Sequence, residues 1–214
     1  MRSKLVESGL FEGLLDPFTP DQFMELRWGG DNVALFGNFI PCQSLKRRPK
    51  LTYESQDEDR LHCALFFAVR DFLSVDQIKT ADDEVTPVEE VMEKLSDEVA
   101  GKAAEANKKQ FVHWARINMK GHWDTTGEDM VEYLPPCPLR FEGFFRYFMV
   151  LCKQSSKIID WKSQQIKKHS IKGRECFDLQ TILKAHKLRP LAANLVRTSW
   201  DESSDEVRAT VTET

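Results

Sequence analysis

The sequence lacks the long apolar segment that a membrane span needs. A transmembrane helix requires about 18 consecutive apolar residues, and the longest apolar stretches here are interrupted by Arg70 and Arg146. The N-terminal region carries Glu7, Glu12 and Asp16 where a signal peptide needs an unbroken apolar centre. We therefore expect neither a membrane span nor secretion, and we predict a location in the cytoplasm, the nucleus or both.

Motifs for catalysis and for metal binding are also missing. No CxxC or HxxxH spacing occurs, no glycine-rich phosphate loop is present, and the five histidines show no triad pattern. The five cysteines are odd in number and widely spaced, which is typical of reduced thiols rather than of a disulfide framework. We accordingly expect no cofactor and no bound metal, and we favour a protein that is not an enzyme.

The sequence contains enough hydrophobic residues to form one core. A chain of 214 residues with 41% hydrophobic residues, including 14 Phe and 5 Trp, can fill the interior of one domain. We predict a single domain over residues 1–197, with residues 1–18 as a loosely attached N-terminal helix. Few apolar residues and a surplus of acids follow, so residues 198–214 are predicted to be a disordered acidic tail.

Two stretches share the pattern of a helix start. In TPDQ at 19–22 and TPVE at 86–89, threonine caps, proline takes the first helical position, and Gln or Glu completes a capping box. The first predicted helix is short and ends at 29–30. The second runs over 87–109, with apolar residues on one face and acidic residues opposite. It is predicted to be an amphipathic helix packed on a sheet.

Segments that are rich in aromatic residues predict that sheet. We expect strands near 32–40, 61–73, 111–120, 139–153 and 157–161. Segment 61–73 is equally compatible with a buried helix, because a continuous apolar run does not distinguish the two. After Asp178 we predict short helices that are interrupted at Pro190 and end by Val196.

These elements define an α+β fold class. We predict a mixed or mostly antiparallel sheet of about four to six strands, with helix 87–109 packed on it and small helices at both ends. The alternatives are a nuclease-like α/β core, or a largely helical fold if 61–73 is a helix.

A short basic cluster suggests nuclear import. Four cations fall within five residues around a proline, in the manner of an import signal; they are Lys46, Arg47, Arg48 and Lys50. The alternative is a solvated basic turn that faces the acids of residues 57–59.

A longer basic stretch spans residues 153–174 and suggests phosphate contacts. Cations spread along a strand and a linker can neutralise several phosphates of DNA or RNA at once. The candidate contacts are Lys157, Lys162, Lys167, Lys168, Lys172 and Arg174. The alternative is a solvated face that is balanced by the acidic helix at 87–109.

One stretch resembles a catalytic motif. Residues 157–163 read KIIDWKS, an apolar strand that ends in Asp160-x-Lys162. This pattern, with FEGFF at 141–145 and DLQ at 178–180, resembles the core of the PD-(D/E)xK nuclease superfamily. The resemblance implies a divalent Mg or Mn ion held by Asp160 with Glu142, and Lys162 orienting the attacking water. Arg146 occupies the place where that family carries an acidic ligand.

The sequence favours a binding function over catalysis. We predict a non-enzymatic intracellular adaptor or assembly protein that acts through macromolecular contacts, with a protein partner or self-association. A nucleic-acid-binding module that uses residues 153–174 is one alternative, with RNA or DNA as its partner. An active or inactive nuclease relative around residues 160–162 is the other.

Overall fold

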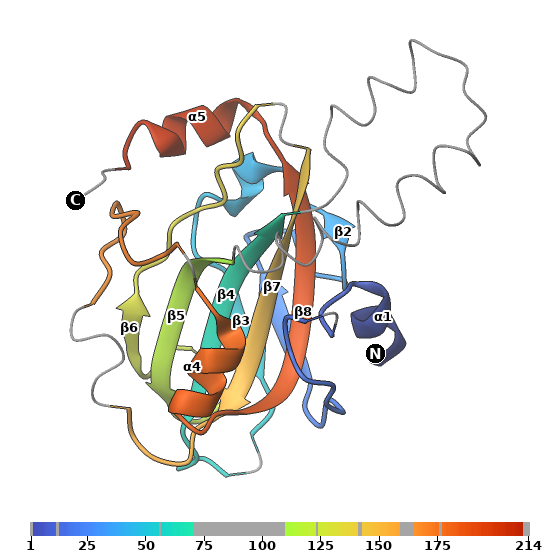
Figure 1. The fold of residues 1–214 in the computed structure, drawn as a ribbon, viewed down its shortest axis with the longest axis vertical. Coiled ribbons are helices and arrows are strands. Elements are labelled where there is room, and N and C mark those ends of the chain that lie inside the picture. The colour runs from blue at the N-terminus through green and yellow to red at the C-terminus, as the bar shows by residue number, and fades with distance from the viewer. Residues whose placement is uncertain are drawn as a thin grey trace.

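The computed structural model describes residues 2–11, 13–55, 57–70, 110–122, 124–140, 143–158, 165–175 and 177–211. Over these ranges the protein consists mostly of β-sheet, with a few short helices at the periphery (Figure 1). The α+β fold class, a sheet organised around one long amphipathic helix, is therefore wrong. The segment predicted to form that helix, 87–109, lies outside the described residues.

Six strands form the main sheet, in the order β2-β8-β7-β4-β5-β6. Their bounds are β2 Asn38–Phe39, β4 His62–Arg70, β5 Phe111–Met119, β6 Glu128–Val131, β7 Phe144–Lys153 and β8 Arg189–Ser199. Neighbouring strands pair antiparallel except β2 and β8, which pair parallel. A second, two-stranded antiparallel sheet joins β1 Met24–Arg27 to β3 Lys50–Tyr53.

The helices among the described residues are short and lie around the main sheet (Figure 1). They are α1 Arg2–Glu7, the 3-10 helix η1 Cys42–Leu45, α4 Leu179–Ala185 and α5 Glu202–Arg208. Helix α4 begins at the predicted cap, because the side chain of Asp178 accepts a hydrogen bond from the backbone N–H of Thr181.

Both faces of the main sheet are buried, which produces two core clusters. On one face Phe66 and Trp114 pack with Leu26 and Leu51 of the two-stranded sheet. On the other face the cluster includes Phe67, Phe148 and Val150 of the main sheet, Leu5 and Leu10 of the N-terminal segment, and Leu179 and Leu183 of α4. Successive residues of a strand point to opposite faces, so each strand contributes to both clusters.

Burial on both faces explains why 61–73 was ambiguous. Residues 62–70 form the central strand β4, which pairs with β5 on one side and β7 on the other. A strand that is covered on both faces reads as a continuous apolar run rather than an alternation. The structure therefore resolves this segment as strand over His62–Arg70, and the largely helical alternative is wrong.

Two segments with predicted helices form strands instead. Residues 24–27 form β1, and residues 189–199 form β8 between β2 and β7. Pro190 is the second residue of β8, near the strand start, where a missing N–H is tolerated. Pairing with distant strands thus overrides the local helix signals.

The segment after residue 197 is ordered at least as far as α5, contrary to the disordered tail expected there. Asp201 and Ser204 form a capping box at the start of α5. The side chains of Ser203 and Ser204 are buried, and the guanidinium of Arg140 lies 4.5 Å from the Trp200 ring centroid. The assignment of residues 1–197 to one domain stays a prediction.

Candidate functional site

A cavity of about 480 Å³ opens between the main sheet and the C-terminal segment, and we call it the apolar pocket. Strands β4, β5 and β7 supply one wall, the 134–139 loop and the 171–175 segment a second, and the end of α5 a third. The lining residues are Ala68, Phe111, His113, Leu134, Cys137, Pro138, Leu139, Phe145, Tyr147, Ile171, Glu175, Arg208 and Val211. Mostly apolar lining with a few polar groups is typical of small-molecule sites.

A β-bulge places His113 in this pocket. In the pairing of β4 with β5, Phe66 lies opposite Trp114 and Phe67 lies opposite Val112, so residue 113 is an extra residue on β5. His113 and Trp114 therefore both contribute to the face of Phe66, where strict alternation would send them to opposite faces. Bulges of this kind commonly redirect a side chain next to a binding site.

The ring of His113 is enclosed by aromatic side chains. Its centroid lies 4.9 Å from that of Phe111, 5.1 Å from Tyr147 and 6.0 Å from Phe66. Only 4% of the residue is exposed. Burial lowers the pKa of His113 to about 3, against the smaller opposing effect of its hydrogen bond to Leu134. The imidazole is therefore neutral at physiological pH.

The tautomer of His113 follows from its partner. Nδ1 lies 2.9 Å from the carbonyl oxygen of Leu134, which can only accept, so Nδ1 carries the proton. In a neutral imidazole the other ring nitrogen, Nε2, is then a hydrogen-bond acceptor. The pocket thus combines apolar walls with an acceptor on a rigid strand, an arrangement suited to an apolar ligand that carries one hydrogen-bond donor.

The C-terminal wall is fastened to the loop that it faces. Arg208, at the end of α5, donates from Nη2 to the carbonyl oxygen of Pro138 at 2.6 Å. The end of β8, which leads toward α5, is anchored as well. The Cys42 thiol contacts the Thr198 hydroxyl and donates to the carbonyl oxygen of Ser199, both at 3.3 Å. The pocket is complete only when this segment is in place.

The second wall depends on Arg174, which the basic stretch predicts to be a phosphate contact. Its side chain is fully buried and donates to the backbone carbonyls of Val112, His113, Glu132, Lys167, Lys168 and Ser170. Burial lowers the pKa of Arg174 to about 10, so the guanidinium stays charged at neutral pH. Arg174 holds the 165–175 segment against β5 and cannot reach a phosphate.

The other predicted nucleic-acid contacts differ in their surroundings. Lys167 forms an ion pair with Glu132 at 3.4 Å, while Lys157, Lys168 and Lys172 are exposed. Lys162 lies outside the described residues. The tentative nucleic-acid interface therefore loses Arg174, and its remaining members stay a prediction.

Two cations of the basic cluster at 46–50 form contacts with other parts of the fold. Arg48 pairs with Asp124 at 3.2 Å, and its guanidinium lies 5.1 Å from the Trp114 ring centroid. Lys46 pairs with Glu206 of α5. Arg47 and Lys50 complete the cluster, and its role as an import signal stays a prediction.

The nuclease-like residues are not placed by the structure. Glu142, Asp160 and Lys162 all lie outside the described residues. Within the described ranges no group of three or more His, Cys, Asp or Glu residues could hold a metal ion. No helix in those ranges is both long and apolar enough to cross a membrane.

Comparisons with known proteins agree on the fold. No family model matches the chain. A phosphatidylethanolamine-binding protein from Plasmodium vivax superposes with a TM-score of 0.67 at 12% identity, over 94% of this chain and 98% of the other. A chain from the crystal structure of carboxypeptidase Y inhibitor complexed with its cognate proteinase gives 0.66 at 14% identity, over 94% and 95%. The fold is thus like that of phosphatidylethanolamine-binding proteins, which replaces the fold class predicted from sequence.

A curated Drosophila melanogaster protein, "Putative odorant-binding protein A5", is 26% identical over 104 residues. The match covers 48% of this chain and 49% of the relative, so this chain spans about half the length of the relative that it matches. These three proteins are named for odorant binding, for phosphatidylethanolamine binding and for inhibiting carboxypeptidase Y. No comparison supports a nuclease or a nucleic-acid-binding protein.

Proposed function

We propose that this protein is a binding protein whose apolar pocket takes a small, largely apolar molecule with one hydrogen-bond donor. The observation that carries the proposal is the bulge that turns neutral His113 into a cavity lined mostly by aromatic and aliphatic groups. The names of the relatives, for odorant binding and for phosphatidylethanolamine binding, support small-ligand binding.

Desolvation explains the preference for such a ligand. An apolar molecule that enters the pocket removes its surface and that of Phe145, Tyr147 and Leu139 from water, at about 25 cal/mol per Å² of apolar area. A donor on the ligand would satisfy Nε2 of His113, whereas an acceptor placed there would stay unpaired at a cost of about 1–3 kcal/mol. The buried neutral imidazole thus selects for donors.

The test uses N-phenyl-1-naphthylamine, an apolar fluorophore with a single N–H donor. We expect its emission to rise on binding and Leu139→Trp to weaken binding about tenfold, which corresponds to about 1.4 kcal/mol. Leu139 is 47% exposed at the pocket wall, so an indole there can fill the cavity with little effect on folding.

The matched control is Leu35→Trp. Leu35 is also an exposed leucine, at 62%, and does not line the pocket. The Leu35→Trp variant should bind the fluorophore as the unmodified protein does. Absence of binding by the unmodified protein, or equal weakening by both variants, would reject the proposal.

A protein partner is the second candidate, and one observation favours it. Phe39 of β2 and Phe144 of β7 are 50% and 41% exposed, and their rings meet edge to face at a centroid distance of 6.1 Å. Exposed aromatic pairs are enriched at protein interfaces. One fold neighbour is an inhibitor that was crystallised with its proteinase, which supports the same candidate. Phe144→Ser should leave fluorophore binding unchanged while reducing self-association, measured by analytical ultracentrifugation, if this surface pairs two copies of the chain.

A further inference from the structure

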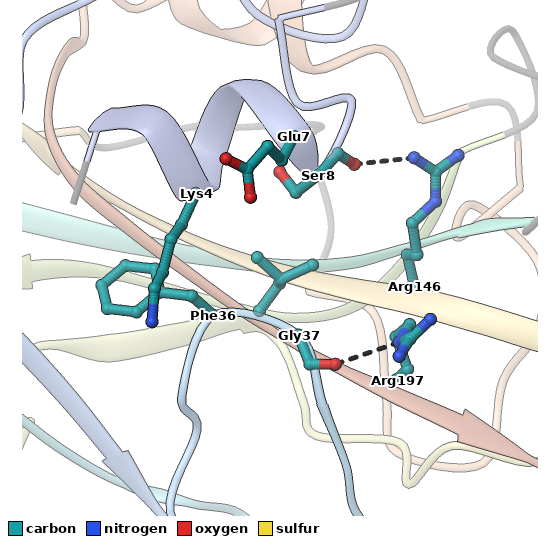
Figure 2. Close-up of a pocket in the computed structure, with 8 residues that line it drawn as sticks. Lys4, Glu7, Ser8, Phe36, Gly37, Arg146 and Arg197 are labelled. Atoms are coloured by element: carbon teal, nitrogen blue, oxygen red, sulfur yellow. Dashed lines mark hydrogen bonds between the residues drawn. The ribbon is translucent and has the colours of Figure 1, made fainter.

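A second cavity, of about 350 Å³, lies on the other face of the main sheet, and we call it the cationic pocket (Figure 2). It is lined by Lys4, Glu7, Ser8, Phe36, Gly37, Arg146, Leu195 and Arg197. Arg146 and Arg197 come from strands β7 and β8, Lys4 and Glu7 from α1, and Phe36 and Gly37 from the turn that precedes β2. Three cations and one acid therefore surround this cavity.

The two arginines face each other across the β7–β8 pair. Arg146 lies directly opposite Arg197 in the antiparallel register. Like charges in directly opposed positions destabilise a sheet. A pair of this kind becomes favourable when an anion lies between the two guanidinium groups, because each charge then meets an opposite one.

Both guanidinium groups are held in place by backbone oxygens. Arg146 donates from Nη1 to the carbonyl of Ser8 at 2.7 Å, and Arg197 donates from Nε to the carbonyl of Gly37 at 3.0 Å (Figure 2). Each bond uses one of the five N–H donors of its guanidinium. The groups are therefore oriented before any ligand arrives, which lowers the entropy cost of binding.

Cations outnumber acids among the described residues that line this cavity, where Glu7 is the only acid. The ion pairs found between described residues include neither Lys4 nor Arg197; the Lys4 ammonium instead lies 5.9 Å from the Phe36 ring centroid. The formal charge of the lining is three cations minus one carboxylate, about +2.

The turn at residues 36–37, which also lines the cavity, has an uncommon backbone conformation. Phe36 has a φ of 57°, in the left-handed region that residues with a side chain seldom adopt. Asn194 stabilises this turn, since its Oδ1 accepts from the Phe36 N–H at 3.0 Å and its Nδ2 donates to the Ala34 carbonyl at 3.1 Å. Strained backbone held by dedicated hydrogen bonds is concentrated at ligand sites.

We infer that the cationic pocket binds a phosphate monoester. Guanidinium forks match phosphate oxygens in paired hydrogen bonds, and cations outnumber acids among the described lining residues. Phe36 and Leu195 offer apolar contact to the organic group of the ester. This site is independent of the apolar pocket.

The test is a titration with phenyl phosphate, followed by calorimetry. Arg197→Gln should weaken binding about tenfold, and Lys4→Gln should weaken it less, because its ammonium stands at the rim. The matched control is Arg189→Gln, which removes one exposed arginine from the same strand, outside the pocket. The Arg189→Gln variant should bind phenyl phosphate as the unmodified protein does. No binding by the unmodified protein, or equal losses in Arg197→Gln and Arg189→Gln, would overturn the inference.

A second arm identifies the source of the phosphate, since free esters and phospholipid head groups share this chemistry. Vesicles of phosphatidylcholine with and without phosphatidic acid are compared by co-sedimentation. Binding of phosphatidic acid vesicles that Arg197→Gln reduces and Arg189→Gln does not would support a lipid head group. Binding of phenyl phosphate alone would support a soluble ester, and failure of both probes would overturn the site. Arg197→Gln should still bind N-phenyl-1-naphthylamine normally, so failure at one pocket can be told from failure at the other.

Discussion

Two neighbouring residues of β7, Arg146 and Tyr147, lead to opposite kinds of site. Arg146 lines the cationic pocket and Tyr147 lines the apolar pocket. Because successive side chains of a strand point to opposite faces, one strand can serve two cavities with contrasting chemistry. The sheet separates them, so that each can bind without touching the other's ligand.

The two pockets differ most in what holds their walls. In the cationic pocket, the side chains of Arg146 and Arg197 are half-buried and exposed, and each donates a hydrogen bond to a backbone carbonyl. The apolar pocket is surrounded by the fully buried Arg174, the bulge at His113 and the capped helix α5. Changes to these supports should therefore damage the apolar pocket and leave phenyl phosphate binding intact wherever the protein stays folded.

The largest expected effect comes from Arg174→Met. The substitution leaves up to six backbone carbonyls without their donor, and each buried unsatisfied group costs about 1–3 kcal/mol before relaxation. We expect the free energy of unfolding, measured by urea denaturation, to fall by about 3–5 kcal/mol.

The matched control for Arg174→Met is Lys172→Met, which removes an exposed cation two residues away. Its free energy of unfolding should change by less than about 0.5 kcal/mol. Equal stability of both variants would show that Arg174 does not hold the pocket wall.

The second-largest expected effect is a loss of stability in acid, which acts through two buried histidines on the sheet face that lines the apolar pocket. Burial lowers the pKa of His113 to about 3, and burial together with the nearby Arg60 charge lowers that of His62 to about 4. Both side chains have an ordinary pKa of 6.5 when unfolded, so the unfolded chain binds protons first as pH falls. Their contribution to stability is complete above pH 6.5 and is lost progressively toward the folded pKa values.

Between pH 6.5 and 5.5 we expect the two histidines together to lower the free energy of unfolding by about 2 kcal/mol. Denaturation at both pH values measures the change, and His62→Leu should halve it. Phenyl phosphate binding should also weaken over this range, because the ligand loses its second charge near pH 6. Fluorophore binding at the neutral His113 should hold in protein that remains folded.

The smallest expected effect comes from Asp201→Ala, which removes the capping box of α5. N-cap substitutions of this type cost about 0.5–2 kcal/mol. The loosened α5 should weaken N-phenyl-1-naphthylamine binding, since Arg208 and Val211 line the apolar pocket. Asp201→Ser keeps a capping oxygen and serves as the control. If Asp201→Ala weakened phenyl phosphate binding to the same degree, the two pockets would not be independent.

Part of the fold could be predicted from the sequence. Residues 62–70, 111–119 and 144–153 form strands within the expected ranges, because aromatic and β-branched residues favour a buried sheet. Strands β1 and β8 were missed, since the TPDQ start and the Ala–Leu content of 189–199 favour helices locally. Their strand state depends on partners more than twenty residues away, which a local pattern does not reveal.

The apolar pocket was harder to predict than the strands that build it. The run Val112-His113-Trp114 breaks the alternation of β5, and this was the available signal for a bulge. The charge pattern places Arg174 among exposed cations, because a sequence does not show that six carbonyls converge on one guanidinium. The acidic composition of residues 198–214 predicts disorder, although Asp201 and Ser204 stand at the spacing of a helix cap.

The position of β8 inside the main sheet has a consequence for how the protein folds. β8 pairs with β7 on one side and with β2 on the other, where Asn38 lies opposite Val196. Until residues 189–199 pair with β7, one edge of β7 has no partner strand, and β2 has no strand of the main sheet with which to pair. Contacts between residues so distant in sequence slow the search for the native topology. An unpaired β7 edge, rich in aromatic residues, is also a template for pairing between chains, so aggregation should compete with folding at this step.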